Sequence, residues 1–261
     1  MNIHPTAIVS PDAELGESVT VGPFAIIEEG TKIGNGCRID AQGQIRKGTT
    51  LGDNCEVGSG AIIGANPQFA GFDPSIPSGV KAGANNIFRE YVTIHRSFQE
   101  NVDTLVGDGN YLMTGTHVGH DSVVGDGNTT ANNVMFAGHV DIGNYCFFGG
   151  GTGIHQFIRI GDYVMAQGLS GLSQDIPPFC MTAAGVNIIS GLNIIGMRRA
   201  GFDPPTRTRI KQAFAMIYQK KIPANEAFQE IPEEDRSEAI RSFFAFFESP
   251  GKKGICLKLK K

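Results

Sequence analysis

A hydrophobic or small residue returns at every sixth position along most of this chain. A helix has a period of 3.6 residues and a half-buried strand alternates with a period of two, so neither produces this pattern. It indicates hexapeptide repeats of a parallel β-helix, in which three hexads make a triangular coil with the first and fifth positions inside. In the N-terminal run, the first positions of the hexads are Ile3, Val9, Leu15, Val21, Ile27, Ile33, Ile39, Ile45, Leu51, Val57 and Ile63. A second run extends from Val106 to Leu172, and its fifth positions are mostly small or β-branched.

The pattern changes to helical spacing in the C-terminal part. Ile210, Phe214 and Ile217 lie on one face of a first predicted helix, and Ile240 and Phe243 belong to a second. We expect these helices to pack against the last coils and close the end of the prism. The sequence therefore predicts a mainly β protein, with a β-helix domain at 1–202 and a helical domain at 203–261.

The hexads fail between residues 66 and 86, a stretch rich in Pro, Gly and Ser. We predict a loop insertion over 66–86, with the repeat resuming at Ile87 and Thr93. A shorter interruption is expected around 97–104. Long loops within compact domains are usually functional or disordered, and we favour a functional loop here.

Composition and charge narrow the classes of function. The net charge of −4 argues against nucleic acid as the main partner. The first residues lack a basic stretch followed by an apolar core, and no apolar run reaches membrane-spanning length, so we expect a cytoplasmic protein without membrane insertion. Cys37 and Cys55 lie 18 residues apart at fifth positions. We expect them to stack in adjacent coils as reduced thiols.

Histidines recur at one outward position on consecutive coils. Counted in coils of 18 from Val106, five residues fall at offset 14 or within one place of it: His120, Gly138, His139, His155 and Gln156. His117 stands three residues before His120. None of these histidines holds a first or fifth position, so a core role is not expected. The predicted column is the candidate site.

Two kinds of chemistry suit such a column. An imidazole with a pKa near 6.5 can take a proton from a sugar hydroxyl that attacks a carbonyl, while a glycine amide donates to the oxyanion. Asp121 could orient His120 if the chain turns a corner there. Clustered imidazoles can also bind a metal. We favour the general base and expect no metal.

The segments THVGHDSVVGD, AGHVDIG, GIHQF and GLNIIGMRRAGF resemble the acyl-[acyl-carrier-protein]–UDP-N-acetylglucosamine O-acyltransferases. The resemblance covers nearly the whole chain. It implies a left-handed β-helix that forms a homotrimer with sites in clefts between subunits. The implied reaction moves an (R)-3-hydroxyacyl group from the phosphopantetheine of acyl carrier protein to the 3-hydroxyl of UDP-N-acetylglucosamine, the first step of lipid A biosynthesis. No further cofactor is implied.

The resemblance also assigns roles to residues. His120 matches the general base, Asp121 its partner, and Gly138 the backbone donor to the oxyanion. The matching substrate-binding positions are Asn66, Gln68, His95, His117, His139, His155, Gln156, Gly168, Asn193 and Arg199. Within that set, Gly168 matches the position that limits acyl length. Asn193 and Arg199 match contacts to uridine and phosphate.

The chain departs from the family pattern near the sugar nucleotide. Asn66 and Gln68 stand where Asp and Lys are common, and Ile195, Ala200 and Val186 replace an acid, an Arg and a His. These departures leave open the acyl length and the acceptor, since a 3-amino sugar nucleotide would also fit the pattern.

Three rival readings belong to other classes. A zinc-dependent β-helix carbonic anhydrase would need a metal. A later acyltransferase of lipid A assembly would need an additional N-terminal uridine-binding domain, for which a repeat that begins at Ile3 leaves no room. A purely structural solenoid would make the histidine column a coincidence.

Overall fold

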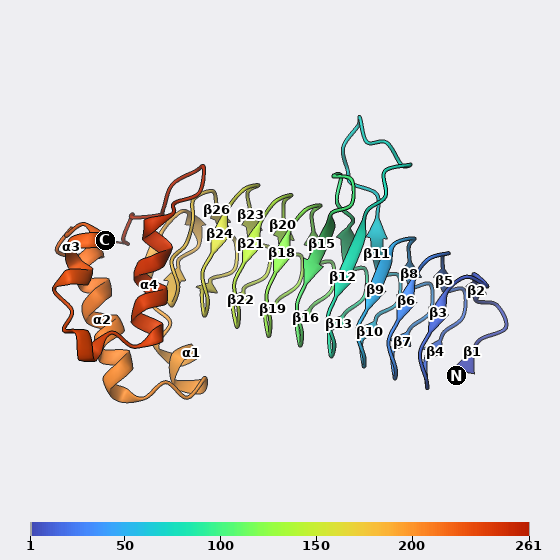
Figure 1. Cartoon of the computed structure of the whole chain (residues 1–261), viewed down its shortest axis with the longest axis horizontal. Coiled ribbons are helices and arrows are strands. Elements are labelled where there is room, and N and C mark those ends of the chain that lie inside the picture. Colours follow the sequence, from blue (N-terminus) through green and yellow to red (C-terminus); the bar gives the residue numbers. More distant parts are fainter. Residues whose placement is uncertain (1, 261) are drawn as a thin grey trace.

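The computed structural model describes residues 2–260, and they wind into a three-sided prism with a helical cap at its C-terminal end (Figure 1). The three faces are sheets of 11, 10 and 8 strands, here called faces A, B and C. Up to β26, successive strands along the chain lie on successive faces. Neighbours within a face pair in parallel, apart from the last pair of face A. The predicted parallel β-helix is confirmed.

Most strands are two residues long, as expected when a chain turns one corner in every six residues. Face A consists of β1 (Asn2–Ile3), β4 (Thr20–Val21), β7 (Arg38–Ile39), β10 (Glu56–Val57), β13 (Ile87–Phe88), β16 (Tyr111–Leu112), β19 (Thr129–Thr130), β22 (Phe147–Phe148), β25 (Met165–Ala166), β27 (Cys180–Thr182) and β29 (Ile189–Leu192). Face B consists of β2 (Ile8–Val9), β5 (Ile26–Ile27), β8 (Gln44–Ile45), β11 (Ile62–Ala65), β14 (Thr93–His95), β17 (His117–Val118), β20 (Met135–Phe136), β23 (Gly153–Ile154), β26 (Ser170–Leu172) and β28 (Gly185–Val186). Face C consists of β3 (Glu14–Leu15), β6 (Lys32–Ile33), β9 (Thr49–Leu51), β12 (Gly79–Ala82), β15 (Asp103–Val106), β18 (Val123–Val124), β21 (Asp141–Ile142) and β24 (Arg159–Ile160).

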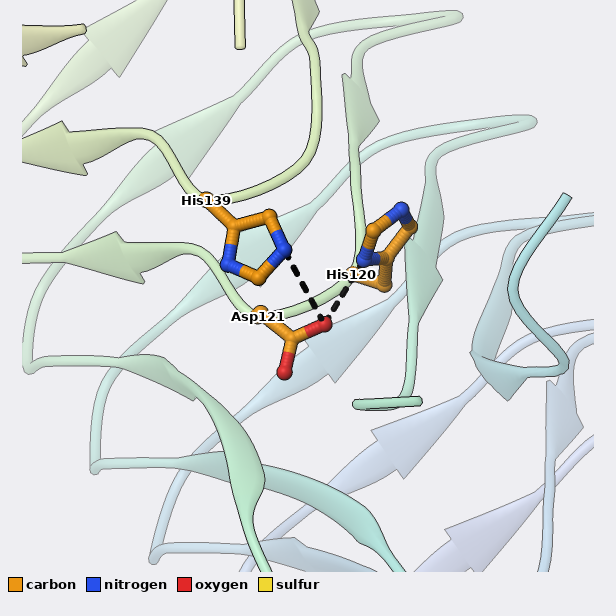
Figure 2. Close-up of side chains that lie close together, drawn as sticks. All are labelled: His120, Asp121 and His139. Atoms are coloured by element: carbon orange, nitrogen blue, oxygen red, sulfur yellow. Dashed lines mark hydrogen bonds and ion pairs between the residues drawn. The ribbon is translucent and has the colours of Figure 1, made fainter. Parts of the chain in front are cut away.

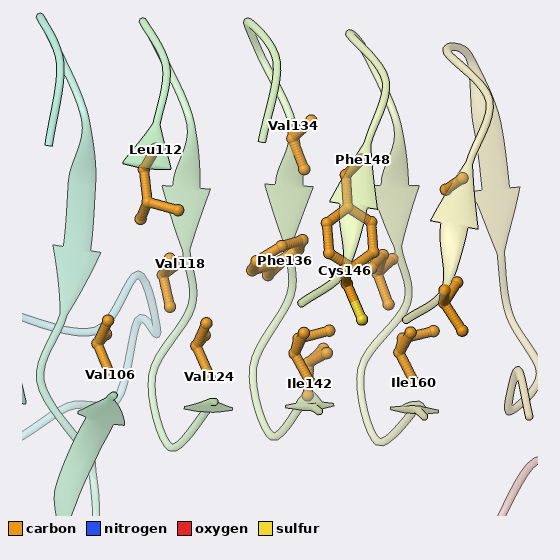
Figure 3. Packing of buried hydrophobic residues seen from close by; sticks show 14 of the residues in the cluster. Val106, Leu112, Val118, Val124, Val134, Phe136, Ile142, Cys146, Phe148 and Ile160 are labelled. Atoms are coloured by element: carbon orange, nitrogen blue, oxygen red, sulfur yellow. The ribbon is translucent and has the colours of Figure 1, made fainter. Parts of the chain in front are cut away.

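The first position of most hexads fills the prism, as predicted. Leu112, Val118 and Val124 come from the three faces of one coil and are 0–1% exposed (Figure 3). Polar residues at the fifth position are also buried, and they bond to the backbone of the next coil. Ser122 Oγ, for example, donates to the carbonyl of Ala137 at 3.1 Å. Burial of such a hydroxyl costs little free energy when it has a hydrogen-bond partner.

The predicted boundary of the first insertion is wrong at its C-terminal end. Residues 79–82 form β12, a strand of face C that pairs with β9 on one side and β15 on the other. The projecting loop therefore spans 66–78. Val80 and Ala82 are the inward residues of the resumed coil, but a short strand after a Pro-, Gly- and Ser-rich stretch carries too few apolar residues to be recognised.

The same insertion shifts the frame of the repeat. Ile63 pairs with Ile94, 31 residues later, whereas plain coils pair residues 18 apart. Thirteen extra residues are not a multiple of six, so the inward positions move by one. Phe88 and Ile94 are consequently buried, and the expected inward residues Ile87 and Thr93 are only half-buried. The second interruption ends where β15 begins, at Asp103, and adds one whole hexad without a shift.

The helical cap contains the two predicted helices and more. Its elements are α1 (Ile194–Arg199), α2 (Pro204–Tyr218), α3 (Ala224–Gln229), the 3-10 helix η1 (Glu233–Asp235) and α4 (Glu238–Glu248). Asp203 caps α2 by accepting from the N–H of Thr206 at 2.7 Å. Ile210 and Phe243 belong to the same hydrophobic core as the last coils. The C-terminal tail then returns to the prism, where Ile255 and Leu259 form β-bridges.

The five cysteines of the described residues are free and buried. Cys37 and Cys55 lie at equivalent places in adjacent coils, and each donates to a backbone carbonyl at 3.1 Å. The expected stacking of Cys37 and Cys55 in adjacent coils is confirmed. In residues 2–260, none of the helices is long and apolar enough to cross a membrane.

Candidate active site

A groove of about 780 Å³ lies on face B of the prism, at the edge where face B turns into face C. It is lined by six of the predicted site residues: Gln68, His95, His117, His120, Gly138 and His155. Sequence arithmetic placed His120, Gly138 and His155 in one column, and the parallel register of β17, β20 and β23 brings them together.

His120 and Asp121 form a hydrogen-bonded pair at this corner. His120 Nδ1 lies 2.7 Å from Asp121 Oδ2 (Figure 2). The two side chains can meet because Asp121 adopts a left-handed backbone conformation, with φ of 60°, in the turn after β17. The corner that this pairing requires is confirmed. With Nδ1 engaged by the carboxylate, Nε2 is the ring nitrogen left for chemistry.

Gly138 lies directly against the imidazole of His120. A Cβ atom at Gly138 would stand 2.6 Å from Cε1 and 2.7 Å from Nε2 of that ring. Only glycine therefore fits while the ring keeps this position. Because residue 138 has no side chain, Nε2 of His120 lies beside the backbone of Gly138.

Asp121 is held by several donors. Its side chain is only 3% exposed. Oδ1 accepts from the hydroxyl of Ser97 and from Gln99 Nε2 at 2.8 Å. Oδ2 faces His120, and the N–H of Phe98 donates to it at 3.4 Å. Burial alone would raise the pKa of Asp121, but these hydrogen bonds outweigh burial and lower the pKa to about 2.

A second pair of histidines lies beside the first. His117 Nδ1 is 2.9 Å from Thr93 Oγ1, and His95 Nδ1 is 2.5 Å from the carbonyl oxygen of Asn66. The two rings meet edge to face with centroids 5.0 Å apart. Burial, together with the nearby His95 and His120, lowers the pKa of His117 to about 4. Burial also lowers the pKa of His95.

His139 lies on the opposite side of Asp121 within an aromatic cluster. Its ring stacks on Phe157 at 4.7 Å and meets Phe98 edge to face at 5.4 Å. Burial lowers the pKa of His139, although the carboxylate of Asp121 opposes this effect. His155 and Gln156 follow on the next coil as exposed side chains.

His120, Asp121 and His139 also bring three possible metal-binding atoms within 4.8 Å of one another. The donor set fits a hydrogen-bonded pair better than a metal centre. His120 Nδ1 is already at hydrogen-bond distance from Asp121, and both oxygens of the carboxylate accept other hydrogen bonds. These contacts would have to break before an ion could enter.

Comparison with known proteins places this geometry in a family. A family model described as Udp N-acetylglucosamine O-acyltransferase, Domain 2, matches residues 175–256, and one for six bacterial transferase hexapeptide repeats matches residues 30–66. A Burkholderia mallei protein named acyl-[acyl-carrier-protein]–UDP-N-acetylglucosamine O-acyltransferase is 45% identical over 253 residues, which cover 95% of this chain and 96% of that protein. The chain belongs to the UDP-N-acetylglucosamine O-acyltransferase family.

Solved structures of similar proteins agree along the whole chain. A UDP-N-acetylglucosamine acyltransferase from Bacteroides fragilis has a TM-score of 0.89 and 35% identity, and the match covers 97% of this chain and 98% of that one. The enzyme from Campylobacter jejuni has the same TM-score and identity over 100% of both chains. These matches confirm the expected fold class, a left-handed parallel β-helix with a helical C-terminal part.

Six of the ten residues that the family resemblance assigns to substrate do not line this groove. Asn66 and His139 contact the lining residues His95 and His120, and Gln156 follows His155. The other three are Gly168, Asn193 and Arg199. Gly168 lies in the turn that leads into β26, where face A meets face B, and it packs against Gly150. Asn193 is occupied locally, because Nδ2 donates to the carbonyl of Tyr163 at 2.9 Å and Oδ1 caps α1. Arg199 is exposed at the end of α1. Their assigned roles remain predictions.

The sequence did not single out Ser97, Phe98 and Gln99, which donate hydrogen bonds to the carboxylate of Asp121 from outside its own coil. They occur in the second interruption of the repeat, where periodicity offers no guide.

Proposed function

We propose that this protein transfers an (R)-3-hydroxyacyl chain from acyl carrier protein to the 3-hydroxyl of UDP-N-acetylglucosamine, the first step of lipid A biosynthesis. One observation carries the proposal. His120 is bonded to Asp121 at 2.7 Å and lies over Gly138 in the groove. This arrangement occurs in a chain that is 45% identical to a relative named for this activity.

The chemistry needs a base and an oxyanion donor. Nε2 of His120 takes the proton of the sugar hydroxyl as its oxygen attacks the thioester carbonyl. Asp121, ionised at neutral pH, stabilises the resulting imidazolium. The tetrahedral intermediate then collapses: the carbon–sulfur bond breaks, and His120 returns the proton to the departing thiolate of phosphopantetheine.

Gly138 is positioned to supply the oxyanion donor. Among the backbone hydrogen bonds of the described residues, none uses the N–H of Gly138. A donor that is already oriented beside the base costs no reorganisation when negative charge develops on the carbonyl oxygen. Gly138 thus has a catalytic role in the proposal, through its backbone rather than through a side chain.

The groove has an apolar part suited to an acyl chain. Among the residues that line it, Met135 and Val186 are exposed apolar side chains. Gly168 precedes β26, and Gly171 of that strand also lines the groove. This continuity supports the proposal that Gly168 limits the length of the bound chain.

We include the oligomer, the partners and the location in the same proposal. Asn193 and Arg199 lie at the cap, and the groove is open on one face of a single chain. A neighbouring copy would add the missing wall, which supports a homotrimer with acyl carrier protein and UDP-N-acetylglucosamine as partners. Free thiols at all five cysteines support a cytoplasmic location.

The acceptor can be decided directly. The purified protein is incubated with UDP-N-acetylglucosamine and a panel of 3-hydroxyacyl carrier proteins, and the products are analysed by mass spectrometry. The proposal predicts one ester-linked acyl chain on the sugar. Transfer only to the 3-amino analogue would refute the proposed acceptor, and neither that sugar nor a zinc-dependent hydration reaction appears in the names of the relatives cited above.

A further inference from the structure

The segment Ser97–Phe98–Gln99 surrounds the carboxylate of Asp121 from a neighbouring coil. Ser97 donates its hydroxyl hydrogen to Asp121 Oδ1, and its Oγ accepts from the N–H of Gln99 at 2.9 Å. Gln99 Nε2 donates to the same carboxylate oxygen at 2.8 Å. The ring of Phe98 meets His120 edge to face at 5.1 Å. All three residues therefore contact the His120–Asp121 pair.

The two oxygens of Asp121 have different partners. Oδ1 is held by Ser97 and Gln99, which leaves Oδ2 directed at His120. His139 Nε2 stands 4.0 Å from the same Oδ2 and competes for it. A carboxylate held only by His120 could rotate towards His139, and the imidazole of His120 would then lose its fixed orientation.

The two donors differ in their surroundings. Ser97 is fully buried, and its carbonyl accepts from Ser78, so it also has a structural role. Gln99 is exposed, yet its amide is directed at Asp121. When an exposed amide exchanges a hydrogen bond to water for one to a neutral group, the net gain in free energy is small. A hydrogen bond from the amide to a charged carboxylate is considerably stronger.

We infer that Gln99 and Ser97 are positioning residues for catalysis, which fix Oδ1 of Asp121 so that Oδ2 orients the base His120. The inference rests on the proposed function, since it assigns these residues to the same reaction. Neither residue touches substrate in this account, and both act through Asp121. Gln99 is the better one to test because its side chain is exposed and its loss opens no cavity.

The first test replaces Gln99 with methionine, which keeps the length of the side chain and removes the donor. Loss of one hydrogen bond to a charged group predicts a decrease of about tenfold in kcat with little change in KM. Glu100→Met is the matched control, since it introduces the same side chain at the next, exposed position. A Gln99→Met enzyme with unchanged kcat would overturn the inference.

A double-mutant cycle shows whether Gln99 acts through Asp121. In an Asp121→Ala background, Gln99→Met should cause no further loss of kcat, because the group it positions is gone. An additional tenfold loss in that background would overturn the inference. Ser97→Ala should behave in the same way if it folds, and circular dichroism of that variant checks its folding.

A measurement without turnover separates this inference from the proposed function. The carboxyl carbon of Asp121 is followed by NMR during acid titration. Its pKa should be higher in Gln99→Met than in the wild-type protein, where hydrogen bonds hold it at about 2. An unchanged pKa would count against the positioning role even if the wild type acylates UDP-N-acetylglucosamine. A raised pKa in a protein without that activity would leave the contact intact and refute only the proposed function.

Discussion

At the scale of single residues, the site separates its histidines by environment. His120 keeps about a quarter of its side chain exposed, at 24%, and has a carboxylate partner. His117 is more enclosed, and its pKa falls to about 4 because burial and two neighbouring histidines disfavour the charged form. One imidazole is thus placed to exchange a proton, and the other to stay neutral and donate or accept hydrogen bonds.

The neutral state of His117 has a consequence for stability. In the unfolded chain a histidine takes up a proton below about pH 6.5, whereas in the folded protein His117 does so only near pH 4. Between these values the unfolded state binds more protons, so stability falls as pH falls. His117→Gln removes this group. Urea unfolding from pH 7.5 to 4.5 should show a smaller acid loss for the variant, and identical pH profiles would contradict the assigned burial effect.

At the scale of elements, the hexapeptide repeat determines where the strands lie. The interruptions of the repeat supply the residues that surround Asp121. A period of six residues was sufficient to predict the coils, because only inward positions are constrained to be apolar or internally bonded. The one-residue shift of the inward positions after residue 78 could not be predicted, because the hydrophobic pattern does not show how many residues the insertion adds to the coil. Ser97 and Gln99 were not predicted because they lie in the second interruption, outside the periodic pattern. The column of His120 and Gly138 was predictable because both lie on uninterrupted coils.

One arginine contacts the insertion 66–78 at several points. Arg96 is 8% exposed, and its guanidinium donates to the carbonyls of Pro74 and Ile76 at 2.7 Å and to Asn66 Oδ1 at 2.9 Å. The cation also lies 4.9 Å from the ring centre of Phe72. Arg96 therefore contacts several parts of the loop, in addition to the contacts of Asn66 with His95 and of Ser78 with Ser97.

Replacing Arg96 with methionine should free the loop without unfolding the prism. Each buried carbonyl that loses its donor costs about 1–3 kcal/mol, and the loop avoids this cost by opening to water. Hydrogen exchange of residues 66–78 should accelerate strongly, while amides of β17 and β20 stay protected. Arg38→Met is the control, because Arg38 pairs with acids on an exposed surface. Equal protection of the loop in both variants would show that other contacts hold it.

At the scale of the whole molecule, the separation between groove and cap bears on assembly. The groove lies on face B, while Asn193 and Arg199 lie on and beside α1 in the cap. The resemblance assigned all of these residues to one site, but sequence spacing could not show that they lie apart in a single chain. In the proposed homotrimer, the cap residues of one subunit would serve the groove of the next.

Mixed oligomers test this arrangement. His120→Ala and Arg199→Ala subunits are each expected to be nearly inactive alone. If a site takes its base from one subunit and Arg199 from another, random mixing in equal amounts should restore about a quarter of the wild-type activity. Recovery is measured after dissociation and reassembly, with each variant carried through the procedure separately as the control. Mixtures as inactive as the separate variants would place both residues in one subunit or outside the site.

The central claim is that His120 is the general base, and turnover by His120→Ala tests it most directly. A positioned base contributes about 10²–10⁴-fold, so kcat should fall by that factor while the affinity for UDP-N-acetylglucosamine changes little. His120 lies at the surface of a coil, and the free energy of unfolding should stay within about 0.5 kcal/mol of the wild type. Metal chelators should leave wild-type activity unchanged. A folded alanine variant with near-normal kcat, or wild-type activity that disappears with chelators and returns with zinc, would contradict the account.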